Sequence, residues 1–84
     1  MQTPDVMTAV ALAIQYPEEE IVVTDNSPSD VDHALQNAGY EIVDAKSYGD
    51  YSFMVYSNVK NELTMIWNGW TWYVALRGGR VYEW

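Results

Sequence analysis

The single histidine is the residue from which an enzymatic interpretation of this chain would start. His33 directly follows Asp32, and serines occur at several other positions, so the residue types of a Ser-His-Asp triad are present. Residues at i and i+1 of a helix do not face each other, however, so this spacing does not aim the carboxylate at the imidazole. The pattern favours a histidine on a helix surface, and we expect no catalytic residues.

Metal and cofactor motifs are also incomplete. The segment 25–30 offers two carboxylates, but a calcium loop beginning at Asp25 would need glycine at its sixth position and glutamate at its twelfth, and the chain has Asp30 and Gln36 there. Gly78-Gly79 belongs to no phosphate-loop pattern and is typical of a turn. We therefore expect no metal and no cofactor.

Cysteine and membrane signals are lacking. The chain has no cysteine, which removes disulfides and thiol catalysis and suits a reducing compartment. No basic residue precedes the first apolar run, so no signal peptide is expected. No run approaches the length of about 20 apolar residues that a membrane helix needs. The expected location is the cytoplasm of a bacterial host cell.

Charge is divided unequally along the chain. Residues 1–45 contain nine carboxylates and no Lys or Arg, whereas residues 46–84 contain three carboxylates and all four basic residues. The halves carry −9 and +1, which add to the net charge of −8. Such a field attracts cationic partners and repels nucleic acid and anionic lipid, although a net charge of this size also serves solubility. The acidic residues expected to contact a partner are Glu18, Glu19, Glu20, Asp25, Asp30 and Asp32.

Two helices are predicted in the N-terminal half. Thr3-Pro4-Asp5 is typical of a helix start, with Thr3 as the N-cap and Pro4 at the first helical position, and Pro17 ends this helix. Its apolar stripe comprises Val6, Met7, Val10, Ala11, Ala13 and Ile14.

The second helix can begin with either of two capping pairs, Ser27 with Asp30 or Ser29 with Asp32. It runs to about Ala38, its inner face carries Val31, Ala34, Leu35 and Ala38, and Gly39 stops it. Between the helices, residues 21–24 form a β-branched run that fits a strand or an extended connection.

After Gly39 the apolar period becomes that of strands. Asn68-Gly69 predicts a two-residue type I′ hairpin in which Trp67 opposes Trp70, Met65 opposes Trp72 and Leu63 opposes Val74. The expected fold is a single α+β domain over residues 1–84, with the two N-terminal helices packed on one face of an antiparallel sheet formed mainly by the C-terminal half. The expected strands are Tyr40–Ala45, Tyr51–Ser57, Glu62–Trp67, Trp70–Leu76 and Val81–Trp84.

The tryptophans have two interpretations. A small domain needs large apolar side chains in its core, and we assign Trp72 to that role. Trp67 and Trp70 flank the hairpin tip, where an exposed pair would be a natural partner-binding anchor, since tryptophan is enriched at interface hot spots.

In its length, acidity, lack of cysteine and α+β pattern with a Trp-rich hairpin (residues 67–73), the chain resembles the small acidic inhibitors encoded by phages, including anti-CRISPR proteins. The resemblance spans the whole chain and is carried by these general features. It implies a non-catalytic protein whose carboxylates engage the Lys and Arg residues with which a CRISPR effector complex holds guide RNA or target DNA.

Two other functions remain open. An immunity protein or antitoxin would use the same acidic surface to neutralise a basic nuclease toxin. A structural protein would self-associate through its sheet edge or hairpin, and its charge would serve only solubility. The expected partner is a basic protein or ribonucleoprotein complex, without direct binding to nucleic acid or membrane, and the chain itself is expected to be a monomer or small homo-oligomer.

Overall fold

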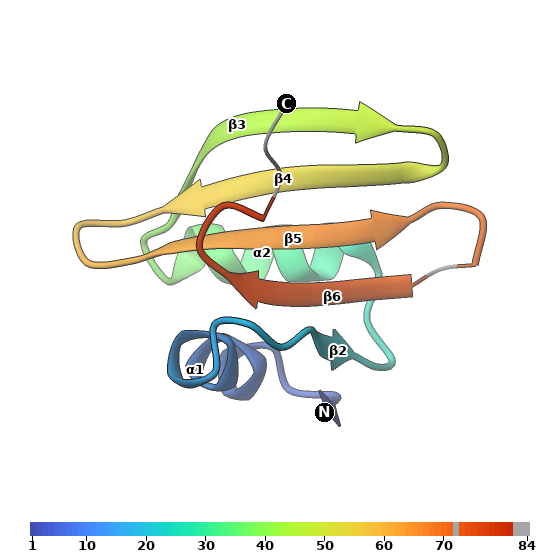
Figure 1. The fold of residues 1–84 in the computed structure, drawn as a ribbon. Coiled ribbons are helices and arrows are strands. Elements are labelled where there is room, and N and C mark those ends of the chain that lie inside the picture. The colour runs from blue at the N-terminus through green and yellow to red at the C-terminus, as the bar shows by residue number, and fades with distance from the viewer. Residues whose placement is uncertain (72, 82–84) are drawn as a thin grey trace.

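The computed structural model describes residues 1–71 and 73–81, and in it two helices cover one face of a six-stranded sheet (Figure 1). The strand order is β1-β2-β6-β5-β4-β3, and neighbours are antiparallel except for β1 and β2. This arrangement confirms the predicted α+β class. The elements are β1 (Gln2–Thr3), α1 (Val6–Gln15), β2 (Ile21–Val23), α2 (Pro28–Asn37), β3 (Glu41–Tyr48), β4 (Tyr51–Ser57), β5 (Glu62–Asn68) and β6 (Tyr73–Gly78).

Helix α1 begins later than predicted. Its N-cap is Asp5, whose carboxylate accepts a hydrogen bond from the Thr8 N–H at 3.1 Å. Thr3 cannot serve as the cap, because it pairs with Val23 in the sheet and its carbonyl accepts from the Thr24 N–H. The apolar stripe is also rotated from the prediction: Val6, Ala9, Val10 and Ala13 are buried, whereas Met7, Ala11 and Ile14 are exposed.

Helix α2 confirms one of the two predicted capping pairs. The Ser27 Oγ accepts from the Asp30 N–H at 3.1 Å, and the Asp30 carboxylate accepts from the Ser27 N–H at 2.9 Å. Of the predicted inner residues, Val31 and Leu35 are fully buried and Ala34 is half-buried, but Ala38 is exposed because it is already the C-cap of the helix. The helix ends before Gly39, which has the positive φ of 95° expected of a C-terminal glycine. The β-branched run after α1 forms the predicted strand, β2.

The register of the β5–β6 hairpin differs from the prediction. Trp67 pairs with Val74 instead of Trp70, and Met65 pairs with Leu76. The physical reason is that the Asn68 side chain accepts from the Trp70 N–H at 2.9 Å, while the Asn68 carbonyl accepts from the Thr71 N–H at 3.2 Å. Asn68 therefore starts the turn, and Gly69 lacks the positive φ of a type I′ turn.

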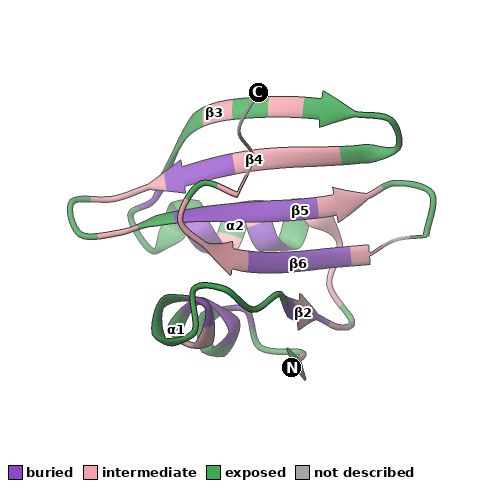
Figure 2. Cartoon of the chain, viewed as in Figure 1, coloured by how far each residue is buried: buried purple, intermediate pink, exposed green. Residues whose placement is uncertain are grey.

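The revised register leaves the faces of the strands unchanged, because each opposing position moves by an even number of residues. Leu63, Met65 and Val74 still face the helices and are buried in the core, as predicted for the Trp-bearing face. Figure 2 shows the burial concentrated in β5, β6 and the inner sides of the helices. Trp72, which the sequence assigned to the core, lies outside the described residues.

Gly78, the last residue of β6, packs against the end of α1. It belongs to the strand and not to a turn, since it pairs with Leu63. A Cβ at this position would lie 2.6 Å from the Ala13 carbonyl oxygen and 2.8 Å from Pro17, so only glycine lets the end of α1 approach the strand this closely. The chain turns at Gly79, where φ is 71°.

The outer strands differ from the predicted boundaries. β3 extends to Tyr48, three residues beyond the prediction, and its pairing with β4 shifts register between Ile42 and Asp44, which marks a β-bulge at Val43. β4 has the predicted bounds. Val81 is not in a strand, and the rest of the predicted strand Val81–Trp84 lies outside the described residues.

Candidate partner-binding surface

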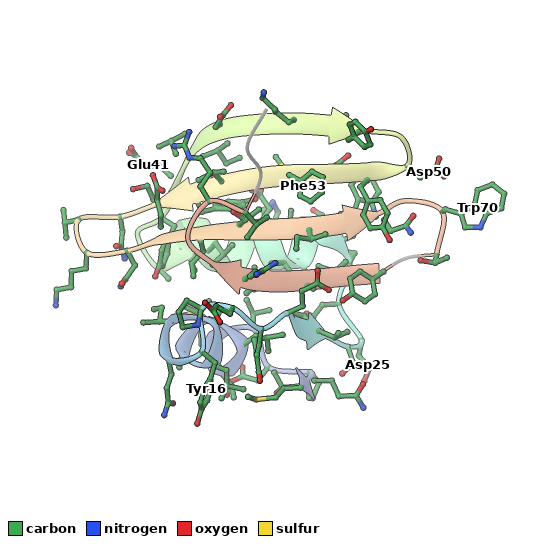
Figure 3. The ribbon with its side chains drawn as sticks, in the orientation of Figure 1. Tyr16, Asp25, Glu41, Asp50, Phe53 and Trp70 are labelled. Carbon is green, nitrogen blue, oxygen red and sulfur yellow. The ribbon has the colours of Figure 1, made fainter. Side chains whose placement is uncertain are left out.

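The connections at one end of the sheet bring acidic and aromatic residues together. We call this the acidic end, and it comprises residues 4–5, 24–27, 48–51 and 69–71 with the first turn of α2. Hydrogen bonds hold the connections to one another: the Asn26 Nδ2 donates to the Pro4 carbonyl at 2.8 Å, and the Gly69 N–H donates to the Asp50 carbonyl at 3.3 Å. In Figure 3, Asp25, Asp50 and Trp70 all lie at this end.

The carboxylates of the acidic end form two groups, those that cap helices and those that are exposed to solvent. Asp5 and Asp30 cap the two helices, and the hydrogen bond from the Ser27 N–H lowers the pKa of the Asp30 carboxyl below its ordinary value of 3.8. The Asp25 and Asp50 side chains are exposed and receive no hydrogen bond or ion pair from the described residues. No Lys or Arg occurs in the connections of this end, so its negative charge faces solvent uncompensated.

Exposed aromatic side chains accompany these charges. Trp70 is 81% exposed at the tip of the β5–β6 hairpin, and Tyr48 is 72% exposed at the β3–β4 turn. Tyr51 pairs with Tyr48 across that turn and is also exposed. Large aromatic side chains in solvent beside carboxylates have the composition of a binding surface, because such rings contribute much of the binding energy at interfaces.

A cleft of about 720 Å³ opens between two of these connections. One side is formed by residues 22–27 and Asp30, and the other by Thr71, Tyr73 and Val74. Its lining includes the core residues Val23 and Val74, and its rim carries the exposed carboxylates of Asp25 and Asp30. Asp25 has a φ of 60°, which holds it in the left-handed region at the tip of the connection.

The predicted acidic residues do not all converge. Asp25 and Asp30 lie at the acidic end, but Glu18, Glu19 and Glu20 follow α1 and lie at the opposite end of β2. The Glu20 carboxylate accepts a hydrogen bond from the Tyr73 hydroxyl at 2.5 Å. Burial, followed by this bond, raises the pKa of Tyr73 above its ordinary value.

Asp32 has a structural partner instead of a solvent-facing position. Its carboxylate accepts from the hydroxyl of Tyr56 on β4 at 2.6 Å and from the Gln36 amide at 3.0 Å. The Tyr56 bond lowers the pKa of Asp32, and burial raises the pKa of Tyr56. This pair ties α2 to the sheet, so Asp32 is poorly placed to meet a partner.

The two tryptophans of the hairpin are not a pair. Trp70 points into solvent, whereas Trp67 is half-buried on the helix side, with its ring 3.4 Å from where a Cβ on Gly69 would lie. The Trp67 Nε1 is buried without a hydrogen-bond partner among the described residues. Trp70 therefore remains available as an anchor, and Trp67 belongs to the edge of the core.

The opposite end of the sheet carries mixed charge, and we call it the mixed end. It comprises residues 16–20, 38–40, 58–61 and 77–81. Arg80 lies 3.3 Å from both the Asp44 and Glu62 carboxylates, and Lys60 and Arg77 are also at this end. Within these ranges the acidic end holds four carboxylates and no Lys or Arg, whereas the mixed end holds three carboxylates, Glu18–Glu20, and three basic residues.

Part of this surface could be found in the sequence and was missed. Gly49-Asp50 between apolar runs is a two-residue hairpin signal, and Gly49 has the positive φ of 61° that such a turn uses. Recognising it would have extended β3 and placed Tyr48 and Tyr51 beside Asp50. The proximity of this turn to the other connections depends on the sheet order, which no local signal gives.

The chain has one histidine, His33. His33 is exposed on α2 and forms no hydrogen bond with the residues that the structure describes. Over the same residues, no three His, Cys, Asp or Glu side chains are grouped closely enough to hold a metal ion. Neither α1 nor α2 is long and apolar enough to cross a membrane.

Comparisons with protein-family models, with curated proteins and with solved structures yield no match to this chain.

Proposed function

We propose that this chain is a non-catalytic binding protein that inhibits a nucleic-acid-handling protein or ribonucleoprotein complex by occupying its cationic surface. The observation that carries the proposal is the acidic end, where the carboxylates of Asp25 and Asp50, which pair with no described residue, lie at the same end of the sheet as the exposed Trp70. The anti-CRISPR type of inhibitor, acting in the cytoplasm of a bacterial host, is the form of this function that we propose.

The arrangement suits a partner whose own surface binds phosphates. Lys and Arg residues that bind a nucleic-acid backbone form cationic grooves, and a surface with matching carboxylates competes for them. Electrostatic steering would accelerate association at low salt, and the aromatic side chains would slow dissociation once water is excluded around them. The acidic end offers both kinds of residue within one set of connections.

Charge neutralisation tests this mechanism with a matched control. We compare Asp25→Asn/Asp50→Asn at the acidic end with Glu18→Gln/Glu19→Gln at the mixed end, because both variants remove two exposed charges. The first should slow association with the partner by about tenfold at low salt, and the second by less than about threefold. Equal effects of the two variants would show that net charge alone matters, and would contradict the acidic end as the binding surface.

The partner itself can be found by capture of proteins from bacterial lysate on the tagged chain, with elution in steps of rising salt and identification by mass spectrometry. Release of a basic nucleic-acid-binding complex at moderate salt is the expected result, because contacts between exposed charges are screened. A basic nuclease toxin in the same fraction would favour the immunity-protein alternative. Recovery of this chain alone would contradict the proposed function and favour self-association.

A further inference from the structure

The cleft at the acidic end has the chemistry of a site for a side chain that carries a cation on an apolar stem. It is lined by the apolar residues Val22, Val23 and Val74 and by Tyr73 of β6. Apolar residues at this position would favour the methylene groups of a ligand. A small hydrated metal ion would gain little binding energy from such an apolar lining.

Asp25, Asp30 and Asn26 offer acceptor oxygens around the cleft, which the hydroxyl residues Thr24, Ser27 and Thr71 also line. Asp25 has no described partner, and Asp30 uses its Oδ2 for the Ser27 N–H while its Oδ1 accepts no described hydrogen bond. Asn26 commits its Nδ2 to the Pro4 and Thr24 carbonyls, both at 2.8 Å, so its oxygen remains to accept. Because no Lys or Arg is among the described residues that line the cleft, the positive charge must come from the ligand.

The rim is held in place before any ligand arrives. The two bonds of the Asn26 amide fix the β2–α2 connection against the N-terminal segment, and the capping box fixes Ser27 and Asp30. The Tyr73 hydroxyl donates a hydrogen bond to Glu20, which restrains the Tyr73 side chain. A rigid site loses less conformational entropy when it binds a ligand.

We infer that this cleft binds an arginine side chain of the partner protein. Arginine has five N–H donors in a planar fork, which can reach acceptors on separate parts of a rim, and its plane stacks on aromatic rings. Lysine offers a single point charge and a smaller contact with such a ring. The inference rests on the proposed function and deepens it, since it names the partner residue that the acidic end would capture.

The test is a titration of the ¹⁵N-labelled full chain with N-acetyl-arginine methylamide, followed by amide chemical shifts. The matched ligands are N-acetyl-lysine methylamide and N-acetyl-citrulline methylamide, the latter having nearly the shape of arginine without its charge. We expect saturable shifts at Thr24, Asn26 and Thr71 with the arginine ligand, weaker binding of the lysine ligand, and negligible shifts with citrulline. Equal shifts with citrulline, stronger binding of lysine, or shifts confined to other regions would overturn the assignment.

Asp25→Asn is the informative variant, because asparagine tolerates the positive φ at this position and only the charge is lost. It should weaken arginine binding by about fivefold or more, which corresponds to about 1 kcal/mol, whereas Asp50→Asn outside the cleft should change it by less than about twofold. Unchanged binding in Asp25→Asn would refute the arginine site.

The failure of this inference can be told apart from the failure of the proposed function. Capture of a basic partner by a chain whose cleft does not respond to the arginine ligand would refute the cleft assignment and leave the proposed function standing. A response of the cleft to arginine, with no basic partner captured from lysate, would support the cleft and count against the proposed function.

Discussion

The two ends of the sheet use their carboxylates differently. At the mixed end, Arg80 lies between Asp44 and Glu62, and the close approach of Gly78 to α1 packs the chain tightly. At the acidic end, Asp5 and Asp30 stabilise helix starts, while Asp25 and Asp50 have no described partner. The comparison teaches that the ends differ in the basic residues beside their carboxylates: both ends carry exposed carboxylates, such as Glu18 and Glu19 at the mixed end, but Lys60, Arg77 and Arg80 lie at the mixed end.

The largest effect on stability is expected at the mixed end. Gly78→Ala should lower the free energy of unfolding by about 2–3 kcal/mol, because its Cβ would meet backbone atoms of Ala13 and Pro17 that cannot rotate away. Gly69→Ala is the control at the acidic end, where the new Cβ meets only the Trp67 ring at 3.4 Å, and it should cost less than about 1 kcal/mol. Urea denaturation measures both, and equal losses would contradict the difference in packing between the ends.

An intermediate loss of stability is expected when the hydrogen bond from Tyr56 to Asp32, which lies between the two ends, is removed. Tyr56→Phe should cost about 1–2 kcal/mol, since it removes a hydrogen bond to a charged acceptor and leaves the ring in place. Tyr16→Phe, which alters an exposed tyrosine, is the control and should leave the denaturation midpoint unchanged. A negligible effect of Tyr56→Phe would show that the tether between α2 and the sheet contributes little.

Acid should weaken the fold through Asp30 and Asp32. The pKa values of both carboxyls lie below their ordinary 3.8, so their contribution is complete above that value and is lost as the pH falls through the lowered values. Thermal melting between about pH 5 and 2 should show a falling midpoint, and Asp32→Asn should make that fall less steep. An unchanged pH profile in Asp32→Asn would assign the acid sensitivity to other carboxylates.

A smaller effect is expected from the capping box at the acidic end. Ser27→Ala should cost about 1 kcal/mol, because the Asp30 N–H loses its acceptor at the start of α2. Ser29→Ala, on an exposed serine with no described hydrogen bond of its side chain, should be close to neutral. The opposite ranking in urea denaturation would restore the other capping pair that the sequence allowed.

The smallest effect on stability is expected at the hairpin tip. Trp70→Ala should change the free energy of unfolding by less than about 0.5 kcal/mol, since the side chain is 81% exposed. The same variant should reduce capture of the partner strongly, as expected for an aromatic anchor. Full capture by a Trp70→Ala chain would remove Trp70 from the proposed binding surface.

Local chemistry explains what the sequence could predict. The capping box of Ser27 and Asp30 involves neighbours in the chain, so the sequence offered it, as one of two capping pairs, without knowledge of the fold. The bounds of β4 followed likewise from its alternating residues. The hairpin register could not be predicted from Asn68-Gly69, because the Asn68 side chain bonds to the Trp70 N–H and lengthens the turn.

Features that depend on pairing between distant segments could not be predicted from the sequence. β1 is two residues long and exists because β2 lies beside it, which is why Thr3 was mistaken for a helix cap. The cleft combines residues 22–30 with 71–74, and only the strand order brings them together. Of the predicted acidic residues, Asp25 and Asp30 lie at this cleft, and the missing members of the surface, Tyr48 and Asp50, belong to a turn that the sequence did signal.

The bulge in β3 affects the tendency of the chain to aggregate at high concentration. β3 is the last strand of the described sheet, and Ile42 and Val43 are exposed along it. A regular outer strand with such residues is a template on which further chains can add and aggregate. The bulge between Ile42 and Asp44 interrupts the even spacing of backbone donors and acceptors that another strand would need, so this edge protects against aggregation through its shape as well as through its charge.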